Sequence, residues 1–169
     1  MDSEQLKALQ APLKAQYKTS PDAALIILKA EGHLGEGVTC SINTARALVD
    51  AGLHPATGGD GFHVCSGDML LQALVACAGV TLNAVATALK IPVGEAKVMA
   101  EGDLDFRGTL GVDREAPVGF TAIRLNFEIG GISEEQKATL LKLTERYCVV
   151  YQTLRNSPRI DVTIGTAGA

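Results

Sequence analysis

The hydrophobic positions of this chain are spaced for helices in some segments and for strands in others. Leucines and a tyrosine recur at helical intervals over residues 3–18, which predicts an N-terminal helix that Pro12 kinks or restarts. Met69–Leu89 is apolar nearly all round, so the sequence predicts a long helix there that is buried on most sides. Ser66 is suited to be its N-cap, and Asp68 complements the helix dipole in the first turn.

A second long helix is expected near the C-terminus. Ser133-Glu134-Glu135-Gln136 is a capping box, and the apolar residues that follow fall near one stripe as far as about Arg155. We therefore predict Glu134–Leu154 as a continuous helix that packs against the first. A shorter helix is predicted over 43–51, closed by Gly52.

Alternating positions predict the strands. Gly119–Ile129 places apolar residues on one face and polar residues on the other, which is typical of a half-buried antiparallel strand. The other strands are predicted at 24–28, 35–42, 92–104 and 160–164, with a hairpin turn over 32–35 between the first two. The glycine-rich segment 53–65 is predicted to lack regular structure.

The order of these elements predicts an α+β protein with helices on an antiparallel sheet. We expect a single domain over residues 1–169, with residues 1–19 as an N-terminal helical extension. A helix that is apolar all round needs burial on several sides, whereas one small sheet covers only one side. The sequence therefore also predicts a homodimer, in which a partner chain supplies the rest.

Composition narrows the function classes. The 169 residues are 47% hydrophobic and carry a net charge of −4, so a nucleic-acid partner is not expected. The N-terminus lacks the features of a secretory signal, and the most apolar segment is interrupted by polar residues, so we expect no membrane span and a cytoplasmic location. In that compartment, the four cysteines stay reduced unless they are catalytic or redox-sensing.

The cysteines are the main candidates for chemistry. Cys77 and Cys148 lie in separate apolar helical segments, where they either fill the core or meet across a helix pair as an attacking and a resolving thiol. Cys65 precedes the predicted helix N-terminus, whose dipole lowers a thiol's pKa, and His63 is close enough in sequence to pair with it. Cys40 is interpreted as a packing residue in a strand.

Other motifs point to no further site. The cysteine and histidine spacing matches no known metal motif, and the Gly58–Gly61 run lacks the strand and spacing of a phosphate-binding loop, so neither a metal nor a cofactor is expected. His54 is interpreted as a solvated loop residue. Asp103 and Asp105 are expected to point the same way at a solvated strand edge rather than to form an acid/base pair.

Four segments taken in order resemble the OsmC/Ohr family of thiol peroxidases. They are the ALVAC segment that ends at Cys77, Gly102–Gly108, Ala116–Ile123 and Cys148–Leu154. The resemblance covers residues 25–164. It implies antiparallel sheets wrapped around two long central helices in an intertwined homodimer. It further implies that Cys77 matches the peroxide-attacking thiol and Cys148 the resolving thiol.

The chain departs from the family pattern around the attacking thiol. Members of the family that act as peroxidases place a glutamate before the attacking cysteine and an arginine early in the chain; here Gly67 stands in the glutamate's place, with Asp68 one step later. Residues 17–40 contain no arginine. We therefore predict that the Cys77 thiolate is stabilised from the 58–68 loop, with His63 as the candidate, or by a basic residue of the partner chain. Cys65 would then be a nearby second reducing group.

Two functions remain open from the sequence. The first is a thiol-dependent peroxidase that reduces organic hydroperoxides through Cys77 and Cys148, regenerated by a dithiol reductant. The second is a relative without peroxidase activity that binds a small apolar ligand at the dimer interface. The retained cysteine pair favours the first function, and the missing glutamate and arginine favour the second.

Overall fold

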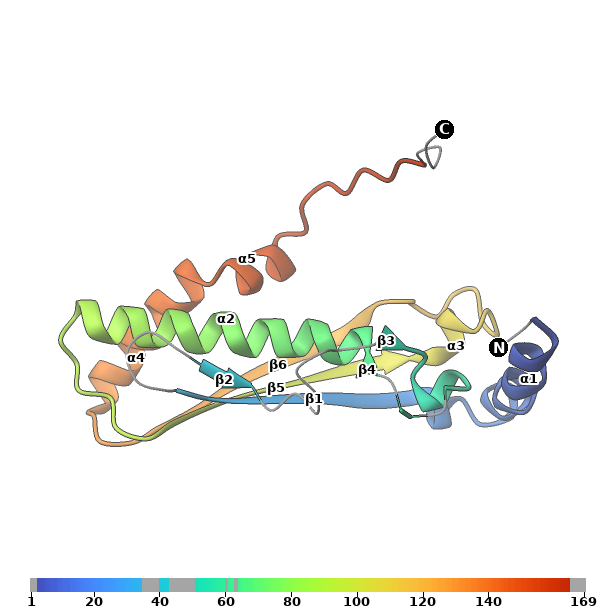
Figure 1. Ribbon diagram of the computed structural model, residues 1–169, viewed down its shortest axis with the longest axis horizontal. Coiled ribbons are helices and arrows are strands. Elements are labelled where there is room, and N and C mark those ends of the chain that lie inside the picture. Colours follow the sequence, from blue (N-terminus) through green and yellow to red (C-terminus); the bar gives the residue numbers. More distant parts are fainter. Residues whose placement is uncertain (1–2, 35–39, 43–50, 60, 63, 165–169) are drawn as a thin grey trace.

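A four-stranded antiparallel sheet with one long helix along its face dominates the molecule (Figure 1). The computed structural model describes residues 3–34, 40–42, 51–59, 61–62 and 64–164. The sheet order is β2-β1-β5-β6, with strands Cys40–Ile42, Leu25–Leu34, Ala96–Asp105 and Phe120–Ile129. The α+β class is therefore confirmed, whereas the predicted dimer remains a prediction.

The two central strands show why the sheet has a buried face. Residues at alternate positions of β5, from Ala96 through Val98 and Ala100, are buried against the helix layer. Val98 is paired with Phe127 and Ala100 with Leu125 in β6. The predicted alternation of β6 is confirmed, because Ile123, Leu125, Phe127 and Ile129 are all half-buried on the face that the sequence assigned.

The long helix α2, Ser66–Ala88, lies along this face of the sheet (Figure 1). Its buried residues are Leu71, Leu74, Val75, Ala78, Gly79, Leu82 and Ala86. The N-cap is Cys65 rather than the predicted Ser66, and it makes no side-chain capping bond. By length and composition alone α2 is apolar enough to cross a membrane, but core helices share that property, and this one packs against β1, β5 and α4.

The predicted second helix is broken, which corrects the sequence interpretation. It forms α4, Glu134–Tyr147, and α5, Val149–Arg155, with Cys148 between them in an extended conformation. Cys148 ends α4 through a bond from its amide to the Thr144 carbonyl, and it caps α5 because its sulfur accepts the Tyr151 N–H at 3.5 Å. A residue that ends one helix and caps the next is not visible in hydrophobic periodicity alone. The capping box that begins α4 is confirmed.

Several smaller predictions are wrong. β1 continues to Leu34, so residues 32–34 lie in a strand rather than in a turn, with His33 paired to Ser41 and Lys97. The 53–65 segment contains a 3-10 turn, η2, Pro55–Thr57, and strand β4, Val64–Cys65, which pairs in parallel with β3, Ala51–Gly52. The helix predicted over 43–51 falls mostly outside the described residues.

The two ends of the chain differ in how they are anchored. The predicted N-terminal helix is confirmed as α1, Ser3–Thr19, and its buried Tyr17 donates a hydrogen bond to the Ala56 carbonyl at 2.6 Å. The 3-10 turn η1, Pro21–Ala24, links α1 to β1. The C-terminal strand predicted over 160–164 does not form, and its apolar residues extend into solvent (Figure 1), with Ile164 99% exposed.

Candidate functional site

Cys77 and Cys148, far apart in sequence, meet between α2 and the junction of α4 and α5. Cys77 lies in the middle of α2 and is half-buried, and Cys148 is 0% exposed. The two side chains are hydrogen-bond partners, and both are free thiols. The structure thus brings together the two residues that the sequence identified as attacker and resolver.

The surroundings of Cys77 favour its thiolate. Burial on its own raises the pKa of Cys77, but hydrogen bonds from the backbone N–H groups of Val150 and Val149, from the Cys148 thiol and from the Thr81 hydroxyl together bring that pKa below its ordinary value. Thr81 lies one turn after Cys77 on α2, so its hydroxyl reaches the same side of the helix. Donors from α2, from the α4–α5 junction and from α5 therefore converge on the Cys77 sulfur.

Cys148 is shifted the other way. Burial raises the pKa of Cys148 to about 11, and its contact with Cys77 and the charge of that neighbour add to the effect, while the Tyr151 amide opposes it. Near neutral pH, Cys77 is therefore the better nucleophile of the two, and Cys148 is held as a neutral thiol beside it. The attacking and resolving roles that the resemblance implies for these two residues stay a prediction.

The break between α4 and α5 creates this arrangement. A continuous helix would tie the amides of Val149 and Val150 to carbonyls one turn earlier. Because α5 starts at Val149, these two N–H groups have no carbonyl partner within α5, and both point to the Cys77 sulfur. Sequence reasoning missed these backbone donors because it read the segment as one helix.

An open pocket of about 580 Å³ lies between β6 and α5, and its lining mixes apolar and polar residues. Its lining includes Leu74, one turn before Cys77, and Tyr151, whose amide contacts Cys148. Three polar residues, Glu145, Tyr151 and Arg155, also line this pocket. The Arg155 guanidinium donates a hydrogen bond to the Tyr151 hydroxyl at 3.1 Å. Neither thiol lines this pocket, but Leu74 and Tyr151 connect it to the surroundings of the cysteine pair.

The accessory candidates are not brought to the pair. Cys65 and Asp68 lie at the N-terminus of α2, and twelve residues of helix place Cys65 about 18 Å along the axis from Cys77. They therefore do not take part in the contacts around the Cys77 thiolate. His63, the predicted activating residue, lies outside the described residues.

His54, interpreted from the sequence as solvated, is instead half-buried. Its ring stacks on Phe106 with centroids 5.0 Å apart, and its Nδ1 accepts the Ala56 N–H at 3.0 Å. Burial lowers the pKa of His54 more than nearby Asp68 raises it, and burial likewise raises the pKa of Asp68 against the opposing effect of His54. His54 and Cys65 share the lining of a second cavity of about 370 Å³.

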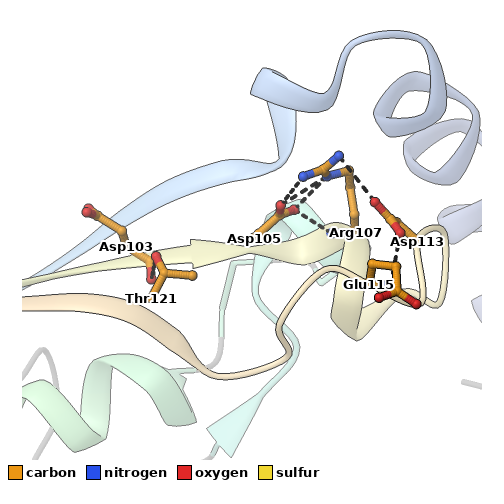
Figure 2. Close-up of polar contacts among 6 residues, drawn as sticks. All are labelled: Asp103, Asp105, Arg107, Asp113, Glu115 and Thr121. Carbon is orange, nitrogen blue, oxygen red and sulfur yellow. Dashed lines mark hydrogen bonds and ion pairs between the residues drawn. The ribbon is translucent and has the colours of Figure 1, made fainter.

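Arginines bind the acidic residues of β5, and Figure 2 shows one of these groups, formed by Asp105, Arg107 and Asp113. Asp105, expected at a solvated edge, is buried, and its carboxylate accepts the Arg107 side chain and the Arg107 backbone N–H at 3.0 Å. Arg107 also approaches Asp113 at 3.5 Å. Asp103 is held by both terminal nitrogens of Arg124, each at 2.7 Å.

These ion pairs decide the electrostatics at this end of the sheet. Hydrogen bonds from Arg107 lower the pKa of Asp105, and those from Arg124 lower the pKa of Asp103. Both carboxylates therefore stay ionised near neutral pH. Among the residues that the structure describes, no three His, Cys, Asp or Glu side chains are grouped to hold a metal ion.

Comparisons with known proteins agree with this architecture. Residues 58–163 match the family model described as OsmC-like protein. An OsmC-like hydroperoxide resistance protein from Jannaschia sp. CCS1 shares the fold with a TM-score of 0.60 and 14% identity, covering 86% of this chain and 97% of that one. An organic hydroperoxide resistance protein OsmC from Legionella pneumophila has a TM-score of 0.53 and 17% identity. The match covers 76% of this chain and 89% of that one. No curated protein matches the sequence.

Proposed function

This chain belongs to the OsmC-like protein family, and on that premise we propose that it is a thiol-dependent peroxidase that reduces organic hydroperoxides. Cys77 is the attacking thiol and Cys148 the resolving thiol. The observation that carries the proposal is the contact between these two thiols, with the pKa of Cys77 lowered and that of Cys148 raised to about 11.

The reaction follows from this pair. The Cys77 thiolate attacks the distal oxygen of the hydroperoxide, the O–O bond breaks, and Cys77 becomes a sulfenic acid while the released alkoxide takes a proton from solvent. Cys148 then gives up its proton and attacks the Cys77 sulfur. A disulfide forms, and the hydroxyl group of the sulfenic acid leaves with the proton as water. A dithiol reductant restores both thiols and is itself oxidised to a disulfide.

The donors around Cys77 take the place of the glutamate and arginine that the chain lacks. Hydrogen bonds from Val149, Val150 and Thr81 favour the charged sulfur, as a nearby positive group would. The activation scheme that relied on His63 is therefore not needed to account for a reactive Cys77. Backbone donors have the further advantage that no side-chain motion can remove them.

The substrate class follows from the pocket between β6 and α5. Its lining includes the apolar side chains of Leu74, Phe120 and Leu125, together with polar residues. Burial of the alkyl or aryl group of an organic hydroperoxide there contributes free energy that hydrogen peroxide cannot supply. We therefore expect organic hydroperoxides to be preferred. A dithiol reductant requires a reducing compartment, which agrees with a cytoplasmic location.

We also propose that the working form is a homodimer. The outer face of α2 exposes Met69 and Val80, and the α4–α5 junction exposes Val149, which is 70% accessible. The segment 160–164 alternates apolar and polar residues but pairs with no strand of the described chain. A second copy would cover these surfaces and offer this segment a sheet edge. Sedimentation showing a stable monomer at micromolar concentration would refute the dimer.

Peroxide consumption by the purified protein tests the proposed activity. With cumene hydroperoxide and dithiothreitol, we expect turnover by the wild type and by Cys65→Ser, and none by Cys77→Ser. Peptide mapping after oxidation should identify a disulfide between Cys77 and Cys148. If the hydroperoxide is not consumed and both thiols persist, the protein is instead a relative that binds a small apolar ligand.

A further inference from the structure

Thr144 is a buried polar residue that the proposed mechanism leaves without a role. It lies on α4 with 1% of its surface exposed. Its hydroxyl is the one buried side-chain oxygen or nitrogen for which the described part of the chain offers no hydrogen-bond partner. Buried hydroxyls are nearly always paired, because leaving one unpaired costs folding free energy. An unpaired hydroxyl in the core therefore calls for an explanation.

The position of Thr144 relative to the cysteine pair provides one. The Cys148 amide donates to the Thr144 carbonyl at 2.8 Å, so Thr144 lies one helical turn before Cys148. Both residues are buried, which places them on the same core-facing side of the helix. α4 and α5 both pack against α2, which carries Cys77. The free hydroxyl thus lies in the layer where the two thiols meet.

A second hydroxyl lies on the opposite side of this layer. Thr81, one turn from Cys77 on α2, already hydrogen-bonds to the Cys77 sulfur. Each threonine therefore lies one turn from one cysteine of the pair, on helices that pack together, and one hydroxyl is engaged while the other is free.

We propose that the Thr144 hydroxyl is the hydrogen-bond partner of the oxygen that a hydroperoxide transfers to Cys77. This inference rests on the proposed peroxidase function and deepens it. When the thiolate attacks, the S–O bond forms and the O–O bond breaks, and the transferred O–H group arrives in a buried layer that holds one unpaired hydroxyl. Thr144 accepts the hydrogen bond of that O–H group. It also donates to the same oxygen when Cys148 displaces it as water.

The energetic logic is one of differential stabilisation. In the reduced protein the Thr144 hydroxyl is unpaired, so it destabilises the ground state slightly. The hydrogen bond forms only when the oxygen is transferred, and an interaction made in the transition state but not before it accelerates the reaction. The residue therefore lowers the stability of the reduced protein and raises its rate of oxidation.

Two substitutions separate this role from a packing role. Thr144→Val replaces the hydroxyl with a methyl group of similar volume, and Thr144→Ser keeps the hydroxyl but removes a methyl group. We expect Thr144→Val to be more stable to denaturant than the wild type, because an unpaired buried hydroxyl is gone. We expect Thr144→Ser to be less stable, because it leaves a small cavity.

The rates should change in the opposite sense. After a stoichiometric pulse of cumene hydroperoxide, the loss of alkylatable Cys77 is followed by quenching and mass spectrometry. We expect Thr144→Val to be oxidised about tenfold more slowly, which corresponds to one hydrogen bond in the transition state, and Thr144→Ser to react like the wild type. The pH profile of Cys77 alkylation should be the same in all three proteins, because Thr144 does not bond to the thiolate.

Equal oxidation rates of Cys77 in Thr144→Val and the wild type would overturn the inference. It would also be overturned if Thr144→Val and Thr144→Ser slowed the oxidation of Cys77 to the same extent. Those outcomes leave the peroxidase proposal standing, because the wild type still reacts. If Cys77 of the wild type is not oxidised at all, the peroxidase proposal fails first, and no oxygen arrives for Thr144 to hold.

Discussion

The molecule places a cysteine at the start of a helix twice, with different consequences. Cys65 precedes the 23-residue helix α2, and Cys148 precedes the seven-residue helix α5. By helix length alone, the dipole argument favours Cys65 as the reactive thiol. Yet the contacts converge on Cys77, which faces the start of the shorter helix.

The difference lies in which groups point at a sulfur. At the α4–α5 junction, two backbone N–H groups, a hydroxyl and a second thiol are directed at Cys77. Cys65 makes no side-chain capping bond with the start of α2, and its neighbour His54 has its Nδ1 occupied by the Ala56 amide. We therefore expect directed donors at hydrogen-bonding distance, rather than proximity to a helix end, to determine which thiol is reactive.

Serine substitution at the two sites tests this comparison with the largest expected effect. Cys77→Ser should lower peroxide consumption by at least about a thousandfold, because it removes the nucleophile. Cys65→Ser should leave the rate of peroxide consumption within about twofold of the wild type, because Cys65 is distant from the reacting thiols. The measurement is turnover of cumene hydroperoxide with a dithiol. A larger loss in Cys65→Ser than in Cys77→Ser would move the chemistry to the start of α2.

Sequence patterns predicted most of the framework, and they singled out two cysteines that the structure brings into contact. The long apolar run of α2 and the alternation of β6 made these two elements predictable, because each pattern continues over many residues. The break at Cys148 was missed, because the apolar stripe continues across it and only capping by the cysteine sulfur interrupts the backbone. The strand expected over 160–164 has the right alternation, but alternation does not specify where a pairing edge will be found.

The site was predicted only in part, for a related reason. Side-chain identities pointed to Cys77 and Cys148, whereas the activating groups are mostly backbone amides that no residue type reveals. His54 was interpreted as solvated because it lies among glycines, but the Phe106 ring that covers it is distant in sequence. A hydroxyl one turn after Cys77, that of Thr81, was the available signal for activation within α2.

Alkaline pH should distinguish the two cysteine sites by their effect on stability. The pKa of Cys148 is raised from 9.0 to about 11, so the folded state keeps a proton that the unfolded state loses, and the stability that this provides disappears as pH rises between those values. The expected loss is about 2–3 kcal/mol of the free energy of unfolding. The lowered pKa of Cys77 affects the free energy of unfolding at lower pH. Its stabilising contribution is complete once the thiol of the unfolded chain is ionised, so it does not change across this window.

Urea denaturation between pH 9 and pH 11 measures this loss. Cys148→Ala should show a flatter dependence of stability on pH, whereas Cys65→Ala should follow the wild type. If Cys148→Ala and the wild type lose stability equally over this window, the buried thiol does not keep its proton.

Removal of the Thr81 hydroxyl should have a smaller effect, confined to Cys77. Thr81→Val deletes one donor to the thiolate, so the pKa of Cys77 should rise and peroxide consumption at neutral pH should fall, by roughly threefold to tenfold for one hydrogen bond to a charged group. Thr81→Ser keeps the hydroxyl and should restore the rate. The pH dependence of Cys77 alkylation is the measurement, and an unchanged profile in Thr81→Val would exclude this donor.

The smallest effect is expected from Val149→Pro, which places a proline directly after Cys148. Cys148 has φ −70° and ψ 110°, a conformation compatible with a following proline, and the first position of a helix tolerates proline well. The substitution removes the Val149 amide but leaves the Val150 amide, which lowers the pKa of Cys77 more strongly. We therefore expect a slight rise in the pKa of Cys77, a peroxidase rate within about threefold of wild type, and unchanged or higher stability. Alkylation profiles and urea unfolding check both parts. A collapse of activity in a folded Val149→Pro protein would show that the Val149 amide, rather than that of Val150, is the main backbone donor to the thiolate.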